Sequence, residues 1–124
     1  YLIRNVIGFD AKSGGLQIGD QLAVGRKLRF HLRDRQKSHD DLVNILDRSR
    51  TRNPRPPAGA MLFSCVGRGQ SLYGEAGHDS RVFRQCMGTV PLGGFFCNGE
   101  IGPVQGTTFL HGYTSSFGLF RPKP

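Results

Sequence analysis

The sequence lacks the long apolar runs and the paired cysteines that mark several classes of protein. No apolar stretch approaches the roughly 20 residues that cross a bilayer, and no segment has the form of a secretory signal peptide. The three cysteines are Cys65, Cys86 and Cys97, an odd number without paired spacing. We therefore expect no membrane association and no disulfide framework, and the cysteine usage predicts reduced thiols in the cytoplasm.

Motifs for metals and nucleotides are equally scarce. No Cys-x-x-Cys or His-x-x-x-His pair pre-organises a metal site, so we expect neither a metal nor another cofactor. The loop Gly67-Arg68-Gly69 follows an apolar run, as a phosphate-binding loop would. It lacks the third glycine of a dinucleotide motif and the Gly-Lys-Ser/Thr of a P-loop. A tight turn is the more frequent role of such a loop, and a phosphate cradle is the alternative.

Acidic residues are few, with nine Asp and Glu against 17 Lys and Arg, which gives a net charge of +8. Ten of the basic residues lie between positions 26 and 55, together with four Asp. Such a region suits an acidic partner, although a solvated surface is the simpler interpretation. Phe30 is the one aromatic residue among these charges, so the platforms for base stacking are missing and nucleic acid is not expected.

The length of 124 residues predicts one domain, 1–124, large enough to bury roughly two-thirds of its unfolded surface. The chain begins without Met inside an apolar segment. We expect it to be excised from a longer protein that carries an N-terminal partner domain.

Hydrophobic patterning predicts the elements of the first half. Leu2–Phe9 and Leu16–Ile18 form a hairpin, and the alternation over Lys27–Arg33 predicts a strand with His31 on its solvent face. Ser38 is expected to cap a helix whose apolar stripe includes Leu42, Ile45 and Leu46. The proline-rich residues 51–57 then form an extended connector.

In the second half, Ala60–Cys65 is expected to be a central strand covered on both faces, and a second helix runs from about His78 to Gly88. Leu92–Cys97 and Glu100–Val104 form a hairpin through an Asn98-Gly99 type I′ turn, and Phe109–Phe120 is the last strand. The order βββ-α-β-α-βββ predicts an α+β fold: a mixed, mainly antiparallel sheet with about two helices packed on it.

The polar candidates gather at the expected hairpin tip. Glu100 either faces water or, with Asn98, holds an ammonium or amide group of a small ligand. His111 is either the cross-strand neighbour of Glu100 or a core histidine bonded to a backbone carbonyl. Cys97 ends the apolar strand and is expected to be the most reachable thiol.

His78-Asp79 carries two interpretations. Asp79 is expected to cap the second helix, which needs only a short side-chain oxygen. The alternative is half of a catalytic dyad, with Cys65 or Cys97 as the nucleophile.

Three segments together resemble the C-terminal domain of FIST proteins (F-box and intracellular signal transduction proteins). They are Ala60–Gly69, Gly77–Ser80 and Pro91–Gly102, which occur in the family's order and spacing, and Tyr1–Asp10 is similar to the family's opening strand. Val66 departs from the pattern, where Asn is expected. The resemblance implies an intracellular sensory module that is paired with an N-terminal FIST domain and binds small ligands such as amino acids. In eukaryotes the family is joined to F-box proteins that select ubiquitination targets.

These observations favour a non-catalytic sensory domain that binds a small ligand, with amino acids as the candidate class. The alternative is a protein-interaction module that docks an acidic partner or a ubiquitination substrate, and a cysteine-dependent enzyme is the third possibility. The candidate ligand-binding residues are Gly67, Arg68, Gly69, His78, Cys97, Asn98, Glu100 and His111.

Overall fold

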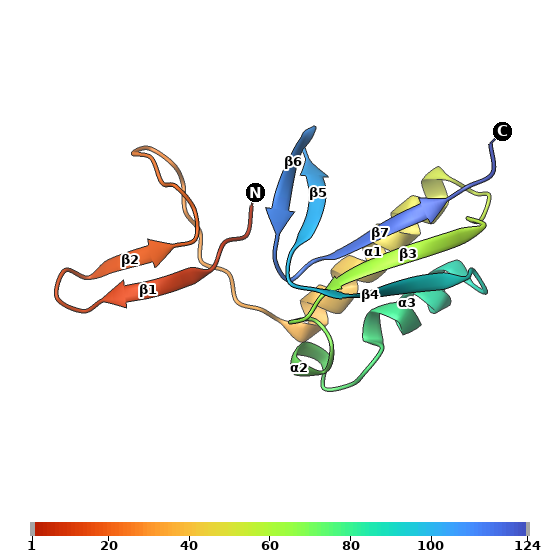
Figure 1. Ribbon diagram of the computed structural model, residues 1–124, viewed down its shortest axis with the longest axis horizontal. Coiled ribbons are helices and arrows are strands. Elements are labelled where there is room, and N and C mark those ends of the chain that lie inside the picture. Colours follow the sequence, from red (N-terminus) through yellow and green to blue (C-terminus); the bar gives the residue numbers. More distant parts are fainter. Residues whose placement is uncertain (1, 124) are drawn as a thin grey trace. The chain divides into compact units, whose positions relative to one another are not determined.

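The computed structural model describes residues 2–123, and these fall into two compact units, one ending at Leu32 and one beginning at Arg33 (Figure 1). Tyr1 and Pro124, the outermost residues of the segments expected at the two ends, lie outside the described residues. That residues 1–124 make one domain stays a prediction.

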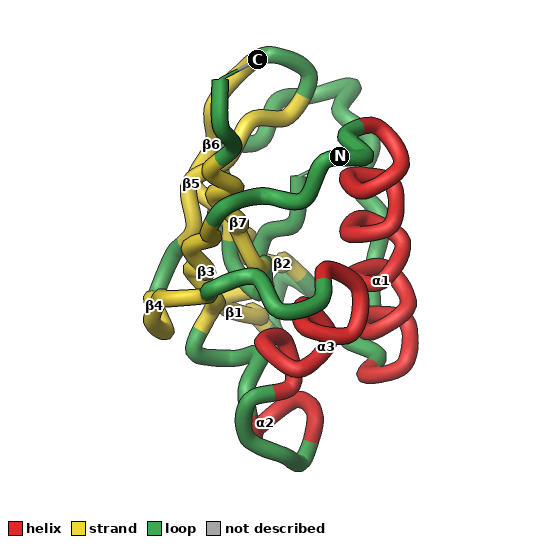
Figure 2. The backbone as a smooth tube through the Cα atoms, turned by 90° about the vertical axis from the view of Figure 1, so that its right-hand side faces the viewer, coloured by secondary structure: helices red, strands yellow, loops and turns green. Residues whose placement is uncertain are grey.

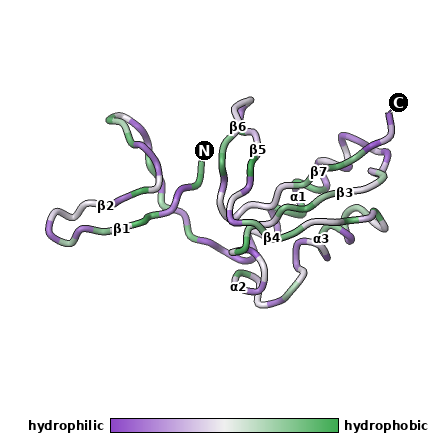
Figure 3. The backbone as a smooth tube through the Cα atoms, viewed as in Figure 1, coloured by the Kyte–Doolittle hydropathy of each residue, from purple (hydrophilic) through white to green (hydrophobic). Residues whose placement is uncertain are grey.

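The first unit is built on one hairpin, as the sequence predicts. β1 (Val6–Asp10) pairs antiparallel with β2 (Gly15–Ile18). Asp10 organises the turn, because its carboxylate accepts from Lys12 N and Ser13 Oγ, and Gly14 supplies the positive φ of 70°. Figure 3 shows β1 as a hydrophobic segment that leads into a hydrophilic turn. The strand is shorter than expected, since residues 2–5 precede it without strand structure.

The strand expected over Lys27–Arg33 does not form. These residues carry no regular structure, and Leu32 is 97% exposed. Alternation describes one face of a strand, but a strand also needs a neighbour to take its backbone hydrogen bonds. None of the described strands forms a β-ladder with this segment.

The second unit is organised by a three-stranded sheet in the order β4-β3-β7. β3 (Gly59–Cys65) is central, parallel to β4 (Leu92–Cys97) and antiparallel to β7 (Ser115–Phe120). A parallel pair needs a crossover. Here the crossover contains α2 (Gln70–Tyr73), which the sequence did not predict, and α3 (His78–Met87), which it did.

The two longer helices cover one face of this sheet, and Figure 2 shows them on the same side of the strands. α1 (Arg35–Arg52) and α3 run side by side in the same direction: His39 meets His78 near their first turns, and Arg50 reaches the Cys86 carbonyl near their last. The core lies between helices and sheet and includes Leu42, Leu46, Ala60, Val82, Phe83 and Val90.

Two details of these helices and strands correct the expectations. The N-cap of α1 is Asp34, whose side chain accepts from Lys37 N at 2.7 Å, so Ser38 lies inside the helix. β3 is covered by helices on one face only, and on its other face Phe63 packs edge-on against Phe95 at 5.2 Å between ring centroids.

The prediction of a hairpin through Asn98-Gly99 is also wrong. β4 pairs with β3, while β5 (Glu100–Val104) pairs with β6 (Thr107–His111). Gly94 favours this arrangement, because a Cβ there would collide with the Leu62 carbonyl oxygen across the parallel pair. The last expected strand is split after His111, where Tyr113 adopts a φ of 60°. The α+β class and the approximate order of elements are confirmed.

Candidate functional site

The candidate site lies where β3 and β4 end. Their carboxyl ends share one edge because the strands are parallel, and the first turns of α1 and α3 reach the same edge. The Gly67-Arg68-Gly69 loop leaves β3 there in a turn closed by a bond from Arg68 N to Cys65 O at 2.9 Å. A Cβ at Gly67 would collide with the Tyr113 ring, and one at Gly69 would lie 3.1 Å from Phe96 Cζ. Close packing therefore explains both glycines.

A buried ion pair forms the centre of the site. Arg68 Nε donates to Asp79 Oδ2 at 2.9 Å and its Nη2 donates to Oδ1 at 3.2 Å, and each residue is 6% exposed. Burial alone would raise the pKa of the Asp79 carboxyl. The hydrogen bonds and charge of Arg68, helped by bonds from Ser115 and His78, outweigh burial and hold that pKa well below its ordinary value.

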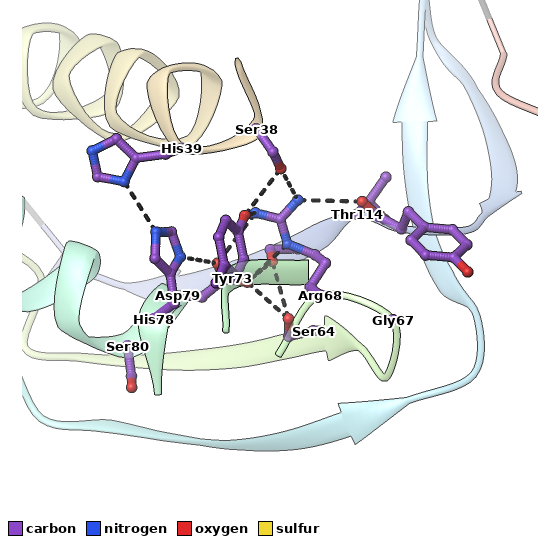
Figure 4. Close-up of polar contacts among 12 residues, drawn as sticks. Ser38, His39, Ser64, Gly67, Arg68, Tyr73, His78, Asp79, Ser80 and Thr114 are labelled. Atoms are coloured by element: carbon purple, nitrogen blue, oxygen red, sulfur yellow. Dashed lines mark hydrogen bonds and ion pairs between the residues drawn. The ribbon is translucent and has the colours of Figure 1, made fainter. Parts of the chain in front are cut away.

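Hydroxyl groups complete this pair (Figure 4). Arg68 also donates to Ser38 Oγ at 2.9 Å, Tyr73 Oη at 2.7 Å and the Tyr113 carbonyl at 3.3 Å. Asp79 Oδ2 accepts from Ser64 Oγ at 2.8 Å and from Ser115 Oγ. The guanidinium and carboxylate are thus surrounded by partners from α1, β3, the crossover and β7.

A chain of imidazoles extends the ion pair toward α1. His78 Nδ1 lies 3.1 Å from Asp79 Oδ1, and its Nε2 lies 3.0 Å from His39 Nδ1. Because Asp79 is ionised, His78 donates from Nδ1, and in its neutral form its Nε2 accepts from His39. The His78 ring also stacks on Tyr73 with centroids 3.4 Å apart. Both nitrogens of His78 are engaged.

Glu100 is the centre of a second cluster, and it is buried rather than facing water, at 2% exposure. Its Oε2 accepts from Thr114 N at 3.2 Å and Thr114 Oγ1 at 2.8 Å, and its Oε1 accepts from Cys97 Sγ at 3.5 Å. His111 is its cross-strand partner and donates from Nε2 to the Gly102 carbonyl at 2.9 Å. His111 is only half-buried, so it is bonded to a backbone carbonyl without being a core residue. Asn98 is exposed.

The sheet separates the two clusters. Side chains alternate along a strand, so Ser64 and its partner Phe96 point to the helix-covered face, and Cys65 and Cys97 point to the other. Arg68 and His78 belong with the helix-covered face through Ser64 and Asp79. The predicted residues meet at one edge, but they lie on the two opposite faces of the sheet.

Sequence reasoning assigned the wrong role to Asp79. The N-cap of α3 is Gly77, with a φ of 69°, and Asp79 is the counter-ion of Arg68. As site residues it missed His39 and five residues that carry hydroxyl groups, Ser38, Ser64, Tyr73, Thr114 and Ser115. The available signal was Arg68 itself, because an arginine directly after a buried strand needs a carboxylate within reach.

Neither of two shallow cavities on the described surface includes these clusters. One is lined by residues of α1, Asp41, Asn44, Asp47, Arg48, Thr51 and Arg52, and the other by Arg84 and residues 88–92. Within residues 2–123 no three His, Cys, Asp or Glu side chains gather as they would around a metal ion.

Comparison with known proteins assigns the class. Residues 1–103 match the FIST C domain family. Uncharacterised proteins of Mycobacterium tuberculosis and Mycobacterium bovis are 41% and 40% identical to this chain over 120 residues. Those residues make up 97% of this chain and 31% of each relative, so the chain spans about a third of their length. Human F-box only protein 22 is 50% identical over 42 residues, 33% of this chain and 10% of that protein.

This match defines a FIST-type signal-transduction domain. The chain belongs to the FIST C family. No helix within residues 2–123 is long and apolar enough to cross a membrane.

Proposed function

We propose that the chain is a non-catalytic sensory domain that binds a small ligand, with amino acids as the candidate class, at the edge where β3 and β4 end. The observation that carries the proposal is the convergence of two parallel strand ends with the first turns of α1 and α3. Ligands of sheet proteins with crossover helices bind at such edges, and helix N-termini favour the carboxylate of an amino acid. We place the domain in the cytoplasm, beside an N-terminal FIST domain.

The saturation of both clusters supports binding over catalysis. Within residues 2–123 every fully buried side-chain nitrogen and oxygen has a hydrogen-bond partner. His78, the candidate general base, is held by Asp79 and His39, and the sheet lies between it and the thiols of Cys65 and Cys97. Such a network suits a fixed frame around an exposed recognition point, for which Asn98, beside the buried Glu100, is the candidate.

A thermal-shift screen of amino acids tests the proposal. A ligand at about 100 times its dissociation constant adds ~2.7 kcal/mol to the free energy of unfolding, which is readily seen as a higher melting temperature. Asn98→Ala should remove the shift and leave the unliganded melting temperature unchanged. Asn44→Ala, on the exposed face of α1, is the control and should keep the shift. A complete screen without any shift would contradict ligand binding.

The second candidate is a protein-interaction module, which the basic stretch 26–55 favours through charge complementarity with an acidic partner or ubiquitination substrate. Pull-down at low and moderate salt separates the two candidates. A partner lost at moderate salt supports the interaction module, and a metabolite-induced melting shift supports the sensor.

A further inference from the structure

Two of the three cysteines are register partners. In the parallel pair β3–β4, Cys65 lies opposite Cys97, and the bond from Val66 N to Cys97 O at 2.9 Å holds this register at the very end of the strands. Neighbouring strands lie about 4.8 Å apart, within the roughly 4.4–6.8 Å between the Cα atoms of disulfide-bonded cysteines. Register partners in parallel strands also point to the same face.

The two thiols differ in solvent exposure and in their polar neighbours. Both are free, Cys65 is 5% exposed, and Cys97 is partly exposed at the end of β4. Cys97 Sγ donates to Glu100 Oε1 at 3.5 Å and to the Ser64 carbonyl at 3.6 Å. One reachable thiol therefore lies beside a carboxylate, with a buried thiol next to it.

Cys86 provides an internal control. It lies on α3 and packs against the core between helices and sheet, on the face opposite to Cys65 and Cys97. Its carbonyl, not its thiol, is bonded to Arg50. A reaction that depends on the register of β3 and β4 should leave Cys86 untouched.

We propose that Cys65 and Cys97 form a thiol–disulfide exchange site that reacts with low-molecular-weight disulfides of the glutathione class. Cys97 Sγ, after losing its proton to Glu100 or water, attacks one sulfur of oxidised glutathione. The glutathione S–S bond breaks and one glutathione thiolate leaves. Cys65 Sγ, also deprotonated, then attacks Cys97 Sγ, forms the Cys65–Cys97 disulfide and releases the second glutathione. Two protein thiols are oxidised and one glutathione disulfide is reduced to two thiols.

The local electrostatics set the pace of this exchange. Partial burial, and then the hydrogen bond and charge of Glu100, raise the pKa of the Cys97 thiol. Since the thiolate is the attacking species, the reaction is slow at neutral pH and quickens as the pH rises. Oxidation also removes the S–H that Cys97 donates to Glu100. The redox state of Cys65 and Cys97 therefore changes the hydrogen bonding of Glu100 in the second cluster.

Equilibration in glutathione buffers of graded ratio at about pH 8, followed by acid quenching, alkylation of the remaining thiols and mass spectrometry, tests the proposal. We expect two of the three alkylations to disappear together, a cross-linked Cys65–Cys97 peptide, and full alkylation of Cys86. Cys86→Ser should give the same cross-link. Cys65→Ser should stop at a glutathione adduct on Cys97.

Three results would overturn the proposal, and each can be read from the wild-type chain without any variant. They are three intact alkylations at every ratio, a persistent glutathione adduct on Cys97 without a cross-link, and a disulfide that includes Cys86.

Discussion

Arg68 and Asp79 form an ion pair that joins the two ends of the crossover between the parallel strands. The guanidinium directly after β3 donates to the carboxylate in the first turn of α3 through two hydrogen bonds of 2.9 and 3.2 Å. Both side chains are buried, so each depends on the other for the partners that water would otherwise supply. This ion pair fixes where α3 begins and holds the candidate site at the edge of the sheet.

Asp79→Asn should lower the free energy of unfolding by about 3–5 kcal/mol, because it leaves the Arg68 guanidinium buried without a counter-ion. Urea denaturation measures this loss. Asp41→Asn, on the exposed face of α1, is the matched control and should stay within about 0.5 kcal/mol of the wild type. Equal losses of unfolding free energy in the two variants would show that the buried ion pair stabilises the fold no more than an exposed carboxylate does.

Asp79 also predicts acid lability. Its pKa is lower in the folded chain than in the unfolded chain, where it is about 3.9. A depressed folded-state pKa contributes stability at pH values above the unfolded pKa, and this contribution is lost as the pH falls through the folded pKa. The difference in unfolding free energy between wild type and Asp79→Asn should therefore be constant from pH 7 to about 5 and shrink below about pH 4. Shrinkage already above pH 5 would assign the effect to other groups.

Glu100→Gln should destabilise the domain by about 1–3 kcal/mol. The carboxylate is 2% exposed and accepts from Thr114 twice and from Cys97, and an amide leaves part of this set unsatisfied. Melting curves of Glu100→Gln and of the exposed control Glu75→Gln give the comparison, with little change expected for the control. An unchanged melting temperature for Glu100→Gln would contradict a stabilising role for the buried hydrogen bonds of Glu100.

Gly94→Ala and Gly93→Ala form a matched pair on β4. A Cβ at Gly94, whose φ is 149°, collides with the Leu62 carbonyl, whereas one at Gly93 makes an ordinary 3.7 Å contact with Met61 Sδ. We expect a loss of about 3 kcal/mol or more for Gly94→Ala and less than about 1 kcal/mol for Gly93→Ala. Chemical denaturation checks both. Similar stabilities for the two variants would contradict the parallel pairing of β3 and β4.

The sequence predicted those parts of the fold that depend on local pattern. Val82 and Phe83 define the buried stripe of α3, and the apolar run 60–65 became β3, because helix and strand periodicities are properties of neighbouring residues. The pattern over Lys27–Arg33 was equally regular and formed no strand, since pairing depends on a partner elsewhere in the chain.

The candidate site was harder to predict for the same reason. Loop Gly67-Arg68-Gly69 and His78 were recognised, but Asp79 was given a local role as a helix cap, and Glu100 was expected either to face water or to hold a ligand, not to be buried. Their actual partners, Arg68 and Thr114, lie 11 and 14 residues away along the chain. Only the pairing of β3 with both β4 and β7 brings these groups together. Asn98-Gly99 predicted a hairpin between β4 and the next strand, which does not form because β4 pairs with β3.

The most direct test of the proposed function is a nitrogen-15 NMR titration of the chain with amino acids. Ligand binding at the carboxyl ends of β3 and β4 should shift the backbone amide signals of residues 65–69, 97–100 and 113–115, saturate with concentration, and leave the exposed face of α1 unchanged. Signals that stay in place at saturating concentrations, or that move only along α1, would contradict a sensory site at this edge.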